Sequence, residues 1–134
     1  DEIKAIKAFV EDGGTLICAG QAWAWVGDKK DIAKYPLNEL GEKLGFAIIG
    51  QNIGKPGPIE SSSFLLGVNS INHTDWWPSM IESDMPGSQV IIRDESMRAM
   101  AIYIPSGKGR TFVFGHAALV RDNPQILMNI LNGQ

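Results

Sequence analysis

Apolar positions recur at helical spacing in three parts of the chain, and a glycine follows each pattern. The first pattern covers residues 3–10 and ends at a pair of glycines, which favour the left-handed conformation that stops helices. The second begins after Pro36 and ends at Gly45, and the third begins after Pro124 and ends at Gly133. Proline suits the first helical position because its missing amide hydrogen needs no partner there. The sequence therefore predicts three helices.

Short uninterrupted apolar runs separate these helical patterns. Residues 15–19 (TLICA) and 46–49 (FAII) resemble strands that are buried on both faces of a parallel sheet. Residues 89–92 predict a further strand, and residues 100–104 and 110–114 predict a β-hairpin around the turn between them. Alternating helices and strands with a late hairpin predict an α/β fold with a mostly parallel sheet.

The stretch between these regions carries a weaker signal. Residues 50–58 contain three glycines and two prolines and predict a loop. Residues 59–87 show no consistent period, and the short apolar run at residues 63–68 fits either a strand or a helix. No element is therefore predicted there.

Composition narrows the class of protein. The 134 residues suit one domain, residues 1–134, and 44% of them are apolar, enough for a hydrophobic core. Twelve basic and 15 acidic residues give a net charge of −3, which argues against a nucleic-acid partner. No apolar run approaches the roughly 20 residues of a membrane span. A single cysteine excludes a disulfide framework.

Several motifs together resemble one domain family. They are residues 9–17 (FVEDGGTLI), 19–23 (AGQAW) and 35–38 (YPLN), followed near the end by 107–116 (GKGRTFVFGH) and 123–125 (NPQ). The chain resembles the class I glutamine amidotransferase-like, flavodoxin-like domains found with enhancin-like metallopeptidases and in TRP-channel-associated factors. The resemblance implies a three-layer α/β sandwich with a mostly parallel sheet. No His-Glu-x-x-His motif is present, so metallopeptidase activity is not implied.

The resemblance also bears on where the chain begins. Domains of that family start with further strands and helices before the one predicted at residues 3–10, so we expect this chain to be a fragment of a longer protein. A sheet truncated at its N-terminal side would expose a strand edge, and exposed edges favour pairing with other strands. The sequence therefore predicts a homo-oligomer.

Cys18 and His116 are the candidate catalytic residues. Cys18 lies near the end of a predicted strand, two residues before Gly20, as in the Gly-x-Cys-x-Gly turn of amidotransferases, but Leu16 replaces the first glycine. His116 follows another predicted strand, where such folds place a base, but alanines replace the Pro-Glu that completes their triad. A cysteine hydrolase or amidotransferase is therefore one hypothesis. The alternative is a buried, inert Cys18 in a degenerate site.

A second candidate site is aromatic. Residues at the end of the first strand and in the middle of the chain combine rings with polar groups, and the predicted ligand-binding set is Gln21, Trp23, Trp25, His73 and Trp76, with Trp77 beside it. Tryptophan clusters at a sheet edge suit carbohydrate stacking or protein contacts. The alternative interpretation is that these rings cover the core.

The function predicted first is a non-catalytic binding or scaffold module for a carbohydrate or a protein, and the cysteine-dependent enzyme is the second. Two histidines and one cysteine form no metal-ligand spacing, so no metal or other cofactor is expected.

Overall fold

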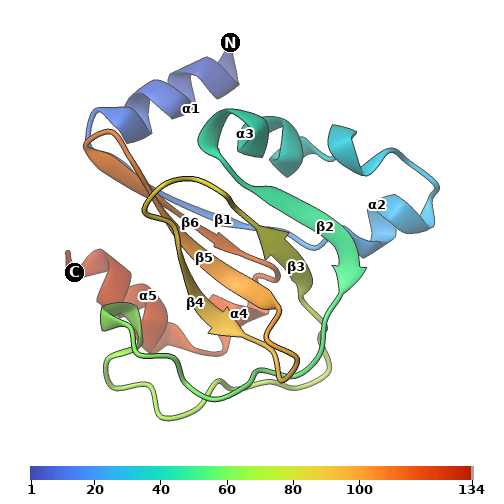
Figure 1. Cartoon of the computed structure of the whole chain (residues 1–134), viewed down its shortest axis with the longest axis vertical. Helices are drawn as coiled ribbons and strands as arrows, with labels where there is room; N and C mark the ends of the chain where they lie inside the picture. The colour runs from blue at the N-terminus through green and yellow to red at the C-terminus, as the bar shows by residue number, and fades with distance from the viewer. Residues whose placement is uncertain (134) are drawn as a thin grey trace.

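A computed structural model describes residues 1–133 and places a four-stranded mixed sheet at the centre of the fold (Figure 1). Its strands lie in the order β1, β6, β5, β4, and β2 and β3 form a separate two-stranded sheet. In chain order the elements are α1 (Glu2–Glu11), β1 (Thr15–Ala19), α2 (Trp23–Gly27), the 3₁₀ turn η1 (Ile32–Lys34), α3 (Pro36–Leu44), β2 (Ala47–Asn52), the 3₁₀ turn η2 (Ser63–Leu65), β3 (Ser79–Glu82), β4 (Gln89–Arg93), β5 (Ala99–Ser106), β6 (Gly109–Phe114), α4 (Ala118–Arg121) and α5 (Pro124–Leu131).

The three predicted helices are confirmed as α1, α3 and α5. Asp1 caps α1, because its carboxylate accepts a hydrogen bond from the Ile3 amide. Both α3 and α5 begin with proline at the first helical position, and α3 ends at Gly45 with φ of 93°. Local sequence signals therefore set the helix ends.

The main sheet combines parallel and antiparallel pairing. β1 runs parallel to β6, while β5 pairs antiparallel with both β6 and β4. The predicted hairpin of β5 and β6 is confirmed, with Ser106 opposite Gly109 at its turn. Buried side chains alternate along β6, so Phe112 and Phe114 join one apolar cluster with α5 while Val113 joins another with α3. Apolar clusters thus lie on both faces of the sheet.

The prediction of a mostly parallel, flavodoxin-like or amidotransferase-like sandwich is wrong. Within residues 1–133, β1 and β6 are the one parallel pair, and β2 pairs antiparallel with β3 outside the main sheet. The side chain of Asn38 on α3 satisfies the backbone of β2 at Ile48, where its Oδ1 accepts from the Ile48 amide at 2.6 Å and its Nδ2 donates to the Ile48 carbonyl at 2.8 Å. An apolar run predicts a buried strand but not its partner.

Three local features differ from the sequence-based expectation. Residues 23–27 form the short helix α2, which the sequence did not predict, and residues 63–65 form a 3₁₀ turn. β3, which the sequence did not predict, follows directly after Pro78. Within residues 1–133, none of the helices has both the length and the apolar character needed to span a membrane.

Candidate functional site

Two distant segments meet just beyond the end of β1. The Nε2 of Gln21 donates a 2.6 Å hydrogen bond to the carbonyl of Trp77, and the Ala22 amide donates to the Oγ of Ser79 at 3.0 Å. Ala22 and Ser79 are both fully buried, so the second of these bonds is shielded from water. The start of α2 is thereby fastened to the start of β3.

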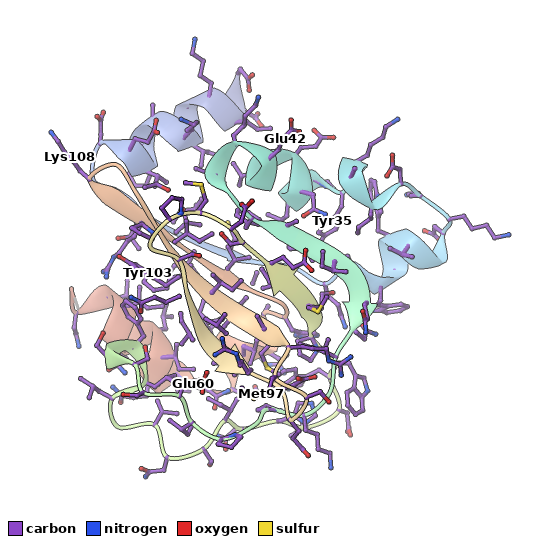
Figure 2. The ribbon with its side chains drawn as sticks, in the orientation of Figure 1. Tyr35, Glu42, Glu60, Met97, Tyr103 and Lys108 are labelled. Carbon is purple, nitrogen blue, oxygen red and sulfur yellow. The ribbon has the colours of Figure 1, made fainter. Side chains whose placement is uncertain are left out.

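Exposed tryptophans flank this junction. Trp23 on α2 is 54% exposed and Trp77 is 47% exposed, while Val26 on the next turn of α2 is also exposed. Trp25 differs, because its ring packs edge-on against Tyr35, its Nε1 donates to the Asp31 carbonyl and Lys30 lies over its face. Figure 2 shows Tyr35 between α2 and α3. Trp25 therefore anchors α2, and Trp23 remains available to a ligand.

A row of aromatic rings continues from Trp77 into the fold. Ring centroids are 5.4 Å apart for Trp77 and His73, 4.6 Å for His73 and Trp76, and 5.3 Å for Trp76 and His116. The His73 Nε2 also lies 2.6 Å from the Trp76 carbonyl oxygen, which requires a proton on that nitrogen. The row joins residues that are more than 40 positions apart in the sequence.

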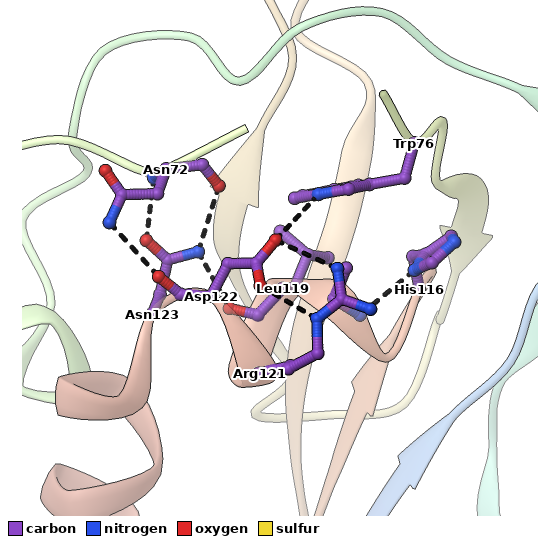
Figure 3. Close-up of polar contacts among 8 residues, drawn as sticks. Asn72, Trp76, His116, Leu119, Arg121, Asp122 and Asn123 are labelled. Carbon is purple, nitrogen blue, oxygen red and sulfur yellow. Dashed lines mark hydrogen bonds and ion pairs between the residues drawn. The ribbon is translucent and has the colours of Figure 1, made fainter. Parts of the chain in front are cut away.

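Trp76 is the structural centre of this row. Its side chain is only 6% exposed, and its Nε1 donates to the Asp122 carboxylate at 3.0 Å (Figure 3). Arg121 forms two hydrogen bonds to the same carboxylate, and these lower the pKa of Asp122. Next to them, the side chain of Asn123 bonds the backbone of Asn72 in both directions. Hydrogen bonds thus join the loop before β3, which carries Trp76, to the connection between α4 and α5.

His116 has a structural partner of its own. Its Nδ1 accepts a 3.0 Å hydrogen bond from the Ala118 amide at the start of α4, so that nitrogen carries no proton. Burial lowers the pKa of His116, the positive charge of Arg121 lowers it further, and Asp122 partly opposes them. The imidazole is therefore neutral near pH 7, and its Nδ1 is engaged in capping a helix.

Cys18 lies away from His116. It is 5% exposed within the apolar cluster of Leu40 and Ile48, whereas His116 stacks on Trp76, which belongs to the cluster on the other face of the sheet. Burial raises the pKa of the Cys18 thiol to about 11, so the thiol is protonated near pH 7. The structure does not bring the two candidate catalytic residues together, and their catalytic role stays a prediction.

The predicted ligand-binding residues do gather in one region. Gln21, Trp23 and Trp25 lie at the start of α2, and His73 and Trp76 lie in the loop that the Gln21–Trp77 hydrogen bond joins to it. Sequence reasoning missed Ser79, because a single polar residue beside a stretch without a clear period carries no signal, and it did not foresee that the side chain of Asn123 bonds Asn72. Within residues 1–133, no three His, Cys, Asp or Glu side chains are grouped so as to hold a metal ion.

Comparison with known sequences points to one group of proteins. Residues 1–61 match the family model TCAF_N, described as TRPM8, N-terminal domain. A TRPM8 channel-associated factor homolog from Xenopus laevis is 39% identical over 69 residues, which cover 46% of this chain and 8% of that protein. The chain therefore spans a small part of the curated relative that it matches.

Comparison with solved structures covers nearly the whole chain. A β-galactosidase from Rahnella sp. R3 superposes with a TM-score of 0.64 at 15% identity, over 97% of this chain and 20% of that one. A cytoplasmic protein from Salmonella typhimurium superposes with a TM-score of 0.58 at 18% identity, over 97% of this chain and 58% of that one. At such identities the likeness shows the fold alone. The fold resembles a part of the β-galactosidase rather than a flavodoxin-like sandwich.

The two sequence matches, to the family model and to the frog protein, agree with part of the resemblance noted from the motifs. The link to TRPM8 channel-associated factors is supported by both the family model and the frog relative, and the glutamine amidotransferase-like assignment is not confirmed. The first half of this chain is similar to the N-terminal region of TRPM8 channel-associated factors.

Proposed function

We propose that residues 1–134 act as a non-catalytic protein-binding module, and that the surface formed by Trp23, Val26 and Trp77 contacts the partner. We call this surface the tryptophan surface. The observation that carries the proposal is the exposure of Trp23 and Trp77 on two segments that the Gln21–Trp77 and Ala22–Ser79 hydrogen bonds hold together. Tryptophan is enriched among the residues that dominate binding energy at protein interfaces.

The rigidity of the supporting residues favours this role. Trp25 and Trp76 are packed and hydrogen-bonded within the two segments that carry the exposed rings, and His73 contacts both Trp76 and Trp77. A surface that is already ordered loses little conformational entropy when a partner binds. Gln21, Trp25, His73 and Trp76 would therefore position the tryptophan surface, and Trp23 and Trp77 would touch the partner.

The name of the frog relative indicates a class of partner. That protein is a TRPM8 channel-associated factor homolog. The separate family-model match, over residues 1–61, includes the start of α2. By analogy, we propose a channel protein of the TRPM8 type as the partner of this chain. The buried Cys18 and the capping role of His116 favour this non-catalytic function over the alternative of a cysteine-dependent hydrolase or amidotransferase.

Biolayer interferometry against detergent-solubilised TRPM8 channel tests the proposal. We expect Trp23→Ala and Trp77→Ala each to weaken binding by about 5- to 30-fold, the effect of losing a tryptophan that dominates an interface. Phe9→Ala is the matched control, because Phe9 is an equally exposed aromatic residue on α1. Equal binding by all four proteins would contradict the proposal, and so would a wild-type protein that does not bind.

Carbohydrate is the other ligand class that exposed tryptophans suit, and a glycan array with the same variants separates the two. Glycan binding that depends on Trp23 and Trp77, without channel binding, would replace the protein partner with a carbohydrate.

A further inference from the structure

A hollow separate from the tryptophan surface lies between α3, the β2–β3 pair and the β4–β5 hairpin. It has a volume of about 640 Å³, and apolar residues such as Phe46, Val90 and Ala99 line it. A second hollow of about 390 Å³ lies between η1, α3 and β2, where Ile32 and Ile49 contribute to its lining. Glu42, Phe46 and Ala47 belong to both linings. The two hollows therefore adjoin, and together they are here called the α3–β2 groove.

Charge is unevenly distributed along this groove. Glu42, Glu82 and Asp84 line the first hollow and are exposed to solvent, and no lysine or arginine is among its lining residues. None of the three carboxylates has an ion pair within the described part of the chain, residues 1–133. Figure 2 shows Glu42 on α3, above β2. The second hollow has only Glu42 as a charged lining residue and is otherwise mostly apolar.

We propose that the α3–β2 groove binds an extended segment of a partner protein in which lysine or arginine residues lie beside aliphatic ones. The cationic side chains occupy the first hollow, where three unpaired carboxylates give them complementary charge. The aliphatic side chain enters the second hollow, where it is removed from water. A segment with acidic in place of basic residues lacks the complementary charge for the first hollow. A wholly polar segment lacks the aliphatic side chain for the second hollow.

The backbone of the groove is already ordered for such a partner. The Asn38 side chain satisfies both the N–H and the C=O of Ile48, and Ser83 donates through its Oγ to the Gly45 carbonyl. Gly45 itself ends α3 with φ of 93°, so the wall of the groove changes direction there. The partner therefore meets a preformed surface, and its side chains provide the specificity.

The inference deepens the proposed protein-binding function but uses different residues, so the two can fail independently. The probe is a fluorescein-labelled hexapeptide of alternating lysine and leucine, titrated by fluorescence anisotropy with protein up to about 1 mM, the weak end of measurable affinity. Two comparison peptides replace lysine with glutamate or leucine with glycine. We expect the lysine–leucine peptide to bind more tightly than either.

The groove variant combines Glu42→Gln, Glu82→Gln and Asp84→Asn. Three exposed ion pairs each contribute a factor of roughly two to five, so we expect Kd to rise by about 10- to 100-fold. The control variant, Glu2→Gln with Asp12→Asn and Glu95→Gln, removes three exposed carboxylates elsewhere and leaves Kd within about twofold. Circular dichroism and thermal melting establish that both variants fold.

Three results would overturn the inference: no binding by the wild-type protein, equal weakening by the groove and control variants, or equal affinity for the lysine–glycine peptide. In the same assay Trp23→Ala leaves Kd unchanged. A loss of peptide binding in that variant would instead assign the peptide to the tryptophan surface.

Discussion

The environment of a single side chain decides its chemistry in this protein, and Cys18 is the clearest case. Its thiol is packed among the aliphatic side chains of α3 and β2, and burial raises its pKa to about 11 from an ordinary value of 9.0. A shift of this size leaves on the order of 100-fold less thiolate near neutral pH. The nucleophile that an enzyme would need is therefore suppressed.

Iodoacetamide labelling tests this property of Cys18. Because the thiolate is the reactive form and the sulfur is buried, we expect labelling at pH 7.5 to be on the order of 100-fold slower in the folded protein than in urea. Mass spectrometry follows the reaction, and the unfolded chain is its own control. Rapid labelling of the folded protein would restore the enzyme hypothesis.

His116 gives a second prediction at the residue scale. Burial and Arg121 lower its pKa, so between the folded and unfolded values the unfolded chain binds more protons. The neutral form therefore contributes stability that is fully present above the ordinary pKa of 6.5 and is lost as pH falls below it. We expect the wild-type melting temperature to rise between pH 5.5 and pH 7.5.

The variant His116→Asn keeps a side-chain acceptor for the Ala118 amide and does not titrate. Its melting temperature should change less than that of the wild type over the same interval. An identical change in both proteins would show that other groups govern the pH dependence.

Among the secondary-structure elements, the turn between β4 and β5 depends on one buried carboxylate. Asp94 is 1% exposed and accepts hydrogen bonds from the amides of Gly54, Ser96 and Arg98 and from the Arg98 guanidinium. Burial alone would raise the pKa of Asp94, but these donors and the charge of Arg98 lower it overall. Asp94 thus joins the turn to the loop after β2.

We expect Asp94→Ala to lower the free energy of unfolding by about 2–4 kcal/mol, because three backbone amides and the Arg98 guanidinium lose a charged acceptor. Urea denaturation measures this difference. Asp75→Ala is the control, since Asp75 is exposed in the loop before β3 and its loss should cost about 0.5 kcal/mol or less. A similar cost for both variants would show that Asp94 has no special role.

For the whole molecule, the least protected feature is the outer edge of β1. The Arg110 amide bonds the Gly14 carbonyl and the Gly20 amide bonds the Phe114 carbonyl, so the even-numbered residues of β1 face β6. Thr15, Ile17 and Ala19 therefore direct their backbone groups outward, and no strand within residues 1–133 pairs with them. β1 also lacks the charges and prolines that protect many edge strands.

Self-association through this edge remains our proposal for the assembly. Antiparallel pairing of two β1 strands centred on Ile17 would join two sheets into one, and light scattering should detect a dimer. Ala19→Lys places a charge on this edge at an exposed position and should shift the protein to a monomer, whereas Lys108→Ala in the exposed turn before β6 should not. A monodisperse wild-type monomer would contradict the proposal.

The elements of this fold were largely predictable, but their arrangement was not. Asp1, Pro36, Gly45 and Pro124 act on backbone groups within one turn, so the helix boundaries follow from neighbouring residues. The candidate site was predictable only as a set of residue types. The sequence does not distinguish the exposed Trp23 from the packed Trp25, which is two positions away.

By itself, the sequence determined three helices, the strands β1, β2, β4, β5 and β6, and the hairpin turn, because short-range capping, glycine conformations and apolar periodicity specify them. The tertiary structure alone decided that β2 pairs with β3 and that Cys18 and His116 lie toward opposite faces. It also decided that Gln21 meets Trp77 and that Trp76 meets Asp122. The last two contacts join residues more than 40 positions apart, and all of these features depend on which surfaces pack together once the whole chain has folded.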